Sequence, residues 1–237
     1  MRSRLVVLLA LAALTLLLLP TSAFADPWEG SRMSIHGGAE YTKTASVLID
    51  YYGSYLSKTG GLLNLHPSGD VGPSCPYWLW PDEHGITIEH PLVRSWASGD
   101  FDVPLAEGDG VKSIGMQYFF DTPDNYSPVY GASVILDTVG PKTLAPYKLA
   151  CKRGGYVTVS YQVNDRLSPK ASVTLRVSNA AGKTLKTAKI GEQDTGKLLT
   201  YLWKCPLGKG KYKYSILATD LAGNKASKTG TNSLTVR

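Results

Sequence analysis

The fold is decided by the stretch Gly210-Lys211-Tyr212-Lys213-Tyr214-Ser215-Ile216-Leu217-Ala218-Thr219-Asp220-Leu221-Ala222-Gly223-Asn224. Its large apolar side chains recur at every second position and its lysines fall between them, which is the period of a strand with one buried face. The row expected to point inward consists of Tyr212, Tyr214, Ile216 and Ala218. The end of the stretch, from Asp220 to Asn224, has the composition of a turn. This stretch therefore predicts a β-strand followed by a tight turn.

Strands with the same alternation surround that stretch, whereas a sustained helical period is absent beyond residue 25. In the second half we expect strands over 155–163, 172–177, 183–190, 198–205 and 233–237. In the first half we expect them over 46–52, 61–65, 86–90, 111–120 and 133–136, with an irregular, aromatic-rich insertion over about 68–102. Many short strands separated by turns predict an all-β chain built of antiparallel β-sandwiches.

A weak internal repeat links the two halves. In each half a strand runs into an Asp and an Asn follows, as Asp121 with Asn125 and as Asp220 with Asn224. Polar residues and a last short strand come next in both places. The repeat suggests two copies of one architecture.

Charge divides the chain at Gly140-Pro141. Residues 26–140 carry 5 Lys and Arg against 15 Asp and Glu, whereas residues 141–237 carry 18 against 4. The formal net charge of +6 is the balance of these opposite halves. Such fields would attract each other or different partners, and the alternative is that both are solvated surface. The sequence predicts an acidic domain over 26–139 and a basic domain over 140–237.

Residues 1–25 have the pattern of a secretory signal peptide. Arg2 and Arg4 precede an apolar run from Leu5 to Leu19, and Ala23-Phe24-Ala25 supplies the small residues of a cleavage site. The run is shorter than the roughly 20 residues that span a bilayer, so a retained anchor is the lesser alternative. We expect a protein that is secreted or held at the cell surface, with no membrane insertion after cleavage and no nucleic-acid partner.

Three segments of the second half form a recognisable pattern: Asp137-Thr138-Val139-Gly140-Pro141, the strand from Tyr156 to Asp165, and Gly-x-Tyr-x-Tyr running into Ala-Thr-Asp-Leu-Ala-Gly-Asn. This pattern resembles the bacterial Ig-like/fibronectin-III-like repeat of secreted and surface proteins, a related form of which occurs in the flagellar hook-capping protein. The first half resembles a neighbouring repeat type through segments 35–42, 109–112 and 135–138. The resemblance implies two tandem Ig-like β-sandwich domains, which serve as spacers, stalks, or adhesive and glycan-contacting modules rather than catalysts.

The same resemblance implies one disulfide. Cys151 lies just before the strand expected over 155–163, and Cys205 ends the strand expected over 198–205. In an Ig-like sandwich these would be strands B and E, antiparallel neighbours in one sheet, so the two cysteines come within bridging range. A Cys151–Cys205 bridge would contribute about 4 kcal/mol in the chain-entropy model. Cys75 would then be a free thiol, either buried or able to join two chains.

No catalytic residue, metal site or cofactor is expected. Hydrolase motifs such as Gly-x-Ser-x-Gly, His-Glu-x-x-His and Cys-x-x-Cys are absent from the sequence, as is a phosphate-binding glycine loop. His84 and His90 would lie about 20 Å apart on one strand, too far to share a metal. Calcium could use the acids Asp100, Asp102, Glu107 and Asp109, or Asp220 with Asn224. In the second case a glycine in the left-handed position favours a plain turn from Asp220 to Asn224.

Aromatic side chains offer the best lead to a ligand. Trp78 and Trp80 would face the same side of an extended segment, with Tyr77 and Trp96 nearby. Sugar rings stack on exposed aromatic faces, so these four residues are candidate glycan contacts. The alternative is that the rings fill a small core.

The sequence therefore predicts an exported, non-catalytic tandem Ig-like module protein with a structural or adhesive role at the cell exterior. Other surface proteins would be its partners. The second hypothesis is a protein that binds extracellular glycans or anionic cell-wall polymers through the aromatic segment or the lysine-rich module. A secreted glycan-active enzyme is the third.

Overall fold

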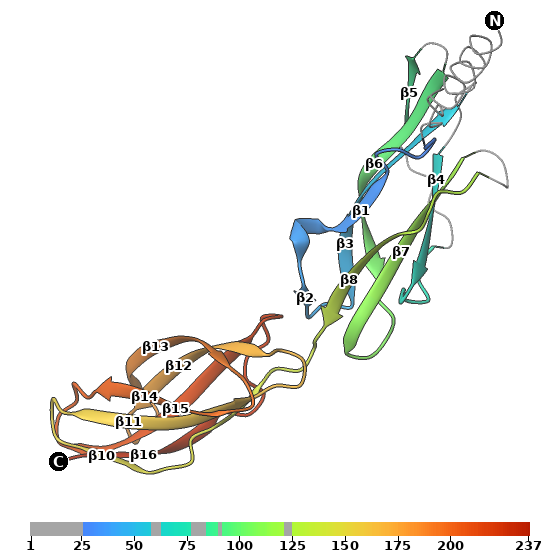
Figure 1. The fold of residues 1–237 in the computed structure, drawn as a ribbon. Coiled ribbons are helices and arrows are strands. Elements are labelled where there is room, and N and C mark those ends of the chain that lie inside the picture. The colour runs from blue at the N-terminus through green and yellow to red at the C-terminus, as the bar shows by residue number, and fades with distance from the viewer. Residues whose placement is uncertain (1–25, 58–62, 77–83, 90–91, 121–124) are drawn as a thin grey trace, which may run out of the picture.

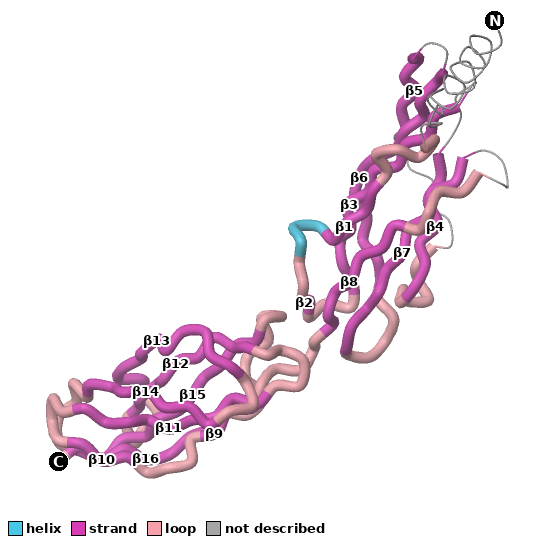
Figure 2. The backbone as a smooth tube through the Cα atoms, viewed as in Figure 1, coloured by secondary structure: helices cyan, strands magenta, loops and turns pink. Residues whose placement is uncertain are grey.

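The computed structural model describes residues 26–57, 63–76, 84–89, 92–120 and 125–237, and the regular structure in them consists almost entirely of strands. The 3-10 turn η2 (His36–Gly38) is the one helical element among them. The prediction of an all-β chain is therefore confirmed. Within these residues, no helix combines the length and apolarity needed to cross a membrane. Figures 1 and 2 show two groups of strands arranged end to end and joined by one linker.

In its described part, the first unit has eight strands, namely β1 (Arg32–Ile35), β2 (Tyr41–Thr42), β3 (Ser46–Ser57), β4 (Leu63–Gly69), β5 (His84–Glu89), β6 (Leu92–Pro104), β7 (Gly110–Phe120) and β8 (Tyr130–Leu136). They make two four-stranded sheets, with the orders β1-β3-β6-β5 and β2-β8-β7-β4. Most neighbours are antiparallel, but the short β2 runs parallel to β8. The alternation of apolar residues along these strands turns one face of each sheet toward a shared core.

The core of the first unit is rich in aromatic rings. Tyr118 is fully buried, and Trp28 packs against both Tyr118 and Tyr55. Tyr55 also stacks on Phe120, with 4.3 Å between ring centroids. The strands β3 and β7 approach closely at Gly53, where a Cβ atom would lie 2.5 Å from the Tyr118 ring. The two sheets therefore enclose one continuous core, as in a β-sandwich.

The second unit is formed by β9 (Lys142–Leu144), β10 (Leu149–Cys151), β11 (Tyr156–Asn164), β12 (Lys170–Ser178), β13 (Thr184–Asp194), β14 (Leu198–Lys204), β15 (Gly210–Asp220) and β16 (Gly230–Val236). A five-stranded sheet, β10-β16-β15-β12-β13, faces a three-stranded sheet, β14-β11-β9. The inward row expected on β15 is found, since Tyr214, Ile216 and Ala218 are buried and Tyr212 packs against the core. Trp203 is buried in this core as well.

Within the irregular insertion expected over about 68–102, the structure has β5, which matches the strand expected over 86–90, and most of β6, which was not expected. The strand β6 pairs antiparallel with β3 over a long register, from Ser46 opposite Pro104 to Ser57 opposite Val93. Its composition conceals it, because Ser98, Gly99 and Asp100 lie in its middle, and such residues are typical of turns. The central position of β3, between β1 and β6, supplies the pairing that local propensity does not.

The last two strands of each unit match at a separation of 100 residues. Strands β8 and β16 have the same sequence of buried and exposed positions, and β7 and β15 differ at a single position. The turns after β7 and β15 also share a hydrogen bond, from Phe120 N to Asn125 O and from Asp220 N to Asn224 O, each 3.1 Å long. Asp220 therefore corresponds to the buried Phe120, whereas Asp121, which the sequence repeat equated with it, lies outside the described residues.

Candidate functional site

The junction between the two units is held by hydrogen bonds from both sides. Thr138 donates to the Asp109 carboxylate of the first unit through its backbone N (3.1 Å) and its hydroxyl (2.8 Å). On the other side, the Asn224 side-chain amide donates to the backbone oxygen of Asp137 (2.7 Å). Lys43 Nζ reaches the carbonyl oxygen of Gly223 at 3.4 Å. These bonds connect the end of β8 directly to the turn that follows β15.

The linker also packs closely on the second unit. A Cβ atom at Gly140 would lie 1.9 Å from the carbonyl oxygen of Lys225, so this position has no room for a larger residue. The Ser227 hydroxyl donates to the carbonyl oxygen of Gly140 (2.9 Å). The linker therefore lies against the turn after β15 rather than crossing solvent.

Three carboxylates converge at this junction. Asp137 follows β8, Asp165 follows β11, and Asp220 ends β15. One oxygen of each lies within 4.8 Å of the others. Asp137 is 2% exposed and Asp220 is 7% exposed, while Asp165 is half-buried. We refer to these three residues as the junction triad.

Hydrogen bonds within local turns hold the carboxylates of Asp165 and Asp220 in place. Asp165 Oδ1 accepts hydrogen bonds from the backbone N of Leu167 (2.9 Å) and of Ser168 (2.8 Å). Asp220 Oδ1 accepts from the backbone N of Asn224 (2.7 Å), in the turn expected from the sequence. Short Asp side chains cap loops in this way. Asp220 Oδ2 also accepts from the Asn224 side-chain amide (3.0 Å), so of these two carboxylates only that of Asp165 keeps a buried oxygen without a hydrogen bond in the described structure.

The surroundings of the triad penalise its charge. Burial raises the pKa of Asp137 above the ordinary value, and the charges of Asp165 and Asp220 raise it further. The pKa of Tyr41, on β2 of the first unit, is raised by burial and also by the charges of Glu40, Asp137 and Asp165. A cavity of about 360 Å³ opens beside the triad and is lined in part by Asp137, Asp165, Lys142 and Arg166. The triad is therefore crowded with like charge, and two of its members, Asp137 and Asp165, line a cavity.

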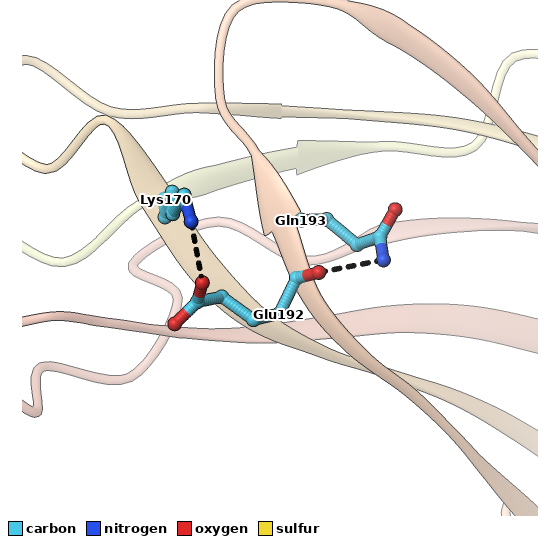
Figure 3. Close-up of polar contacts among 3 residues, drawn as sticks. All are labelled: Lys170, Glu192 and Gln193. Carbon is cyan, nitrogen blue, oxygen red and sulfur yellow. Dashed lines mark hydrogen bonds and ion pairs between the residues drawn. The ribbon is translucent and has the colours of Figure 1, made fainter.

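The other two acids of the basic unit are used differently. Lys170 Nζ contacts Glu192 Oε1 at 2.8 Å, across strands β12 and β13, and Figure 3 shows this pair beside Gln193. Lys197 Nζ contacts Asp194 Oδ2 at the same distance. All four residues are exposed, so these pairs contribute little stability. Glu192 and Asp194 thus pair with lysines at the surface, whereas Asp165 and Asp220 lie beside another carboxylate, that of Asp137.

The candidate glycan contacts are not assembled by the described structure. Trp96 lies on β6, half-buried, and its neighbour Ala97 is fully buried, which places the two side chains on opposite faces of the sheet. Tyr77, Trp78 and Trp80 lie outside the described residues. The glycan site therefore stays a prediction.

The two strands behind the expected disulfide, over 155–163 and 198–205, do pair antiparallel in one sheet, as β11 and β14, but Cys151 lies on a different strand. Cys151 ends β10 in the five-stranded sheet, whereas Cys205 follows β14 of the three-stranded sheet, so they face each other across the core. Both are buried thiols. Burial and the hydrogen bond between the two thiols raise the pKa of Cys151 to about 11. Cys75 is a half-buried thiol at the first core, and burial raises its pKa.

Two of the three triad residues were missed by the sequence reasoning. Of the three, the sequence indicates only Asp220 as a candidate calcium ligand, together with Asn224. Asp137 and Asp165 stand far from it in the chain, and no short motif joins the three. Their convergence follows from the topology, because the end of β8, the end of β11 and the end of β15 meet at one end of the second unit.

Comparison with known proteins identifies no family. No protein-family model matches the chain, and no curated protein matches it. Among solved structures, a tetra-tandem repeat from the extending region of a large adhesion protein matches with 14% identity and a TM-score of 0.34, covering 86% of this chain and 49% of that one.

Two further solved structures match at a similar level. The C-terminal domain of the Streptococcus agalactiae AgI/II polypeptide BspA has 8% identity and a TM-score of 0.33, covering 86% of this chain and 99% of that domain. A Salmonella alpha-2-macroglobulin mutant has 12% identity and a TM-score of 0.31, covering 90% of this chain and 16% of that one. The chain thus spans about half of the adhesion-protein repeat and a small part of the macroglobulin. At these scores the likeness carries no argument about function.

Proposed function

We propose that this chain is an exported, non-catalytic tandem Ig-like module protein with a structural or adhesive role at the cell exterior. One observation carries the proposal, namely that two units with separate cores follow one another and are joined by a short linker bonded on both sides. Such a connection transmits position from one module to the next, which is what a spacer or a stalk requires. The signal-peptide pattern of residues 1–25 supports export.

Export and surface location can be tested together. Protein recovered from outside the producing cell should begin at Asp26 when its N-terminus is sequenced, and brief protease treatment of intact cells should remove it. Cells that lack the chain should attach less well to surfaces or show a weakened envelope. A product retained inside the cell with residues 1–25 uncleaved would contradict the proposal, as would a purified chain that turns over a glycan.

A cell-wall-binding role is a second candidate, supported by the outer face of the five-stranded sheet. Lys211 and Lys213 are exposed on β15, and Arg176 lies on the same face of the neighbouring β12. Cations spread over a flat strand surface suit an extended anionic polymer better than a compact ligand. In that case the outer face of the five-stranded sheet would bind the polymer, and the junction would hold the two units at a fixed distance.

Co-sedimentation with purified anionic wall polymer separates the two roles. The double variant Lys211→Glu/Lys213→Glu should lose most of the binding, and binding by the unchanged chain should weaken as salt is added. Lys148→Glu, an exposed change in the same unit, is the matched control. Binding that instead depends on Trp96 and survives high salt would point to the aromatic segment. No binding in any format would leave only the structural role.

A further inference from the structure

We infer that the junction triad of Asp137, Asp165 and Asp220 is a calcium site that forms only when the two units are in the observed arrangement. The inference goes beyond the proposed function, because a spacer can be built with or without a metal ion. It rests on three observations, which concern a buried oxygen with no partner, the absence of neutralising cations, and the chemistry and spacing of the ligand atoms.

The first observation is an orphaned carboxylate oxygen. Asp165 Oδ2 is shielded from solvent and accepts no hydrogen bond within the described structure. A buried charged oxygen without a partner is costly, and native proteins rarely leave one unsatisfied. The opposite oxygen of the same carboxylate holds the loop through Leu167 and Ser168, so the orphaned one is directed by a fixed turn.

The second observation is that no basic side chain in the described part of the chain forms an ion pair with the triad. Among the described residues, the ion pairs are His36 with Asp50, Lys170 with Glu192, and Lys197 with Asp194. Lys142 and Arg166 line the adjacent cavity, yet neither forms an ion pair with the triad. The second unit carries 18 Lys and Arg, so compensation by a side chain was readily available. Two nearly buried carboxylates beside a third therefore call for a cation from solution.

The third observation selects the cation. The three ligand atoms offered are all carboxylate oxygens, which are the ligands that calcium and magnesium prefer, and no Cys or His belongs to the group. Calcium bonds oxygen at 2.3–2.6 Å, so oxygens on one ion lie at most about 4.6–5.2 Å apart. For magnesium the corresponding limit is about 4.2 Å. Three oxygens within 4.8 Å of one another therefore favour calcium, the larger ion, because it needs the smaller rearrangement of the carboxylates.

The remaining ligands would come from water, for which the adjacent cavity leaves space. Asp137 belongs to the exit of the first unit, whereas Asp165 and Asp220 belong to loops of the second. An ion held by all three would therefore bind the two units to each other. Calcium binding to the triad and the observed arrangement of the two units would therefore stabilise each other.

Isothermal titration calorimetry of the full chain, after chelation of divalent ions, tests the site. Calcium should bind at one site per chain with a dissociation constant on the order of 10⁻⁴–10⁻³ M, as in extracellular modules, and should raise the melting temperature. Magnesium should bind at least about tenfold more weakly. A folded chain that shows neither heat nor a melting shift in millimolar calcium would overturn the inference.

Isosteric variants locate the ion. Asp137→Asn and Asp165→Asn should each weaken calcium binding at least about tenfold, because each removes one of three charges. Asp165→Asn keeps an oxygen for the Leu167 and Ser168 amides, so its loop should fold, which circular dichroism would verify. The control is Asp194→Asn, which changes an exposed acid of the same unit and should leave calcium binding unaltered. Calcium affinity that both triad variants retain would place the ion elsewhere and refute the assignment.

Discussion

The partners of the Asp137 carboxylate become known only from the fold. In the sequence it belongs to a linker motif, and its carboxylate has no evident partner. In the structure its backbone oxygen accepts from Asn224 and its carboxylate accepts from Ser168 (3.2 Å), while two other carboxylates crowd it. The turn at Asp220 could be predicted, because Asp and Asn at that spacing cap a local loop. The triad could not, because it joins residues that only strand topology brings together.

The raised pKa of Asp137 predicts how Asp137→Asn changes the stability of the chain, and the sign of this change should depend on calcium. The folded state holds this proton more tightly than the unfolded chain, so the charged carboxylate lowers stability above the raised pKa, and this cost is relieved as the pH falls through it. With divalent ions chelated at pH 7, Asp137→Asn should therefore be as stable as the unchanged chain or more stable, by on the order of 1 kcal/mol.

Two further conditions complete that test. The difference should shrink at a pH below the ordinary Asp pKa, where both chains are neutral at this position. In saturating calcium the order should reverse, since the variant lacks a ligand. Urea unfolding at both pH values, with and without calcium, measures all four cases. A variant that is less stable than the unchanged chain in chelator would contradict the raised pKa.

The buried cysteines make a second test. Because Cys151 and Cys205 contact each other across the core, treatment of the folded chain with an oxidant should join them, and reduction should then destabilise the second unit by about 2–4 kcal/mol. Mass spectrometry of the unfolded, unreduced protein should find one free thiol, Cys75. Three titratable thiols would show that the pair stays reduced. Cys75→Ser, which leaves the pair intact, is the control.

Among the strands, those with a clear two-residue period were the predictable ones. The sequence located β7, β11, β12, β14 and β15 to within a few residues, because apolar and polar positions alternate along them. Strand β6 was missed because its residues favour turns and only its long pairing with β3 makes it a strand. The repeat between the units was recognised at the correct turn but shifted by one residue, since Phe120 and not Asp121 matches Asp220.

Gly53 tests the close approach of β3 to the opposite sheet. A Cβ atom there would meet the Tyr118 ring at 2.5 Å and the Leu63 side chain at 2.6 Å. Overpacking of this kind costs about 1–3 kcal/mol, so Gly53→Ala should lower the stability of the first unit by that amount. Gly131→Ala, on β8 of the same unit, has no contact closer than 3.7 Å and is the control. Equal melting temperatures for the two variants would show that β3 lies farther from Tyr118.

Across the molecule, the division of charge and the division of sheets fall at the same place. The sheets of the first unit end at Leu136 and those of the second begin at Lys142, and the acidic and basic halves meet between these residues. Composition could reveal this boundary because each domain carries its own surface. It could not reveal that the boundary itself is acidic, since the triad takes its charges from both halves.

Small-angle X-ray scattering tests the effect of the triad on overall shape. In calcium, the full chain should give a narrow distribution of distances consistent with one fixed orientation of the two units. Chelation should broaden it without loss of strand content by circular dichroism. Asp220→Asn in calcium should resemble the chelated chain, and Asp194→Asn should resemble the calcium-bound one. Identical curves for all of these samples would show that the ion does not set the orientation.

The parallel pairs β2 with β8 and β10 with β16 have a mechanical consequence. In each unit a strand near the beginning lies beside the last strand and runs in the same direction. Pulling the two ends of the chain apart would therefore apply shear to these strand pairs. In shear the hydrogen bonds of a pair bear the force together, whereas in the opposite geometry they would break one after another. A molecule stretched between two anchoring points would resist tension in the direction in which its chain runs.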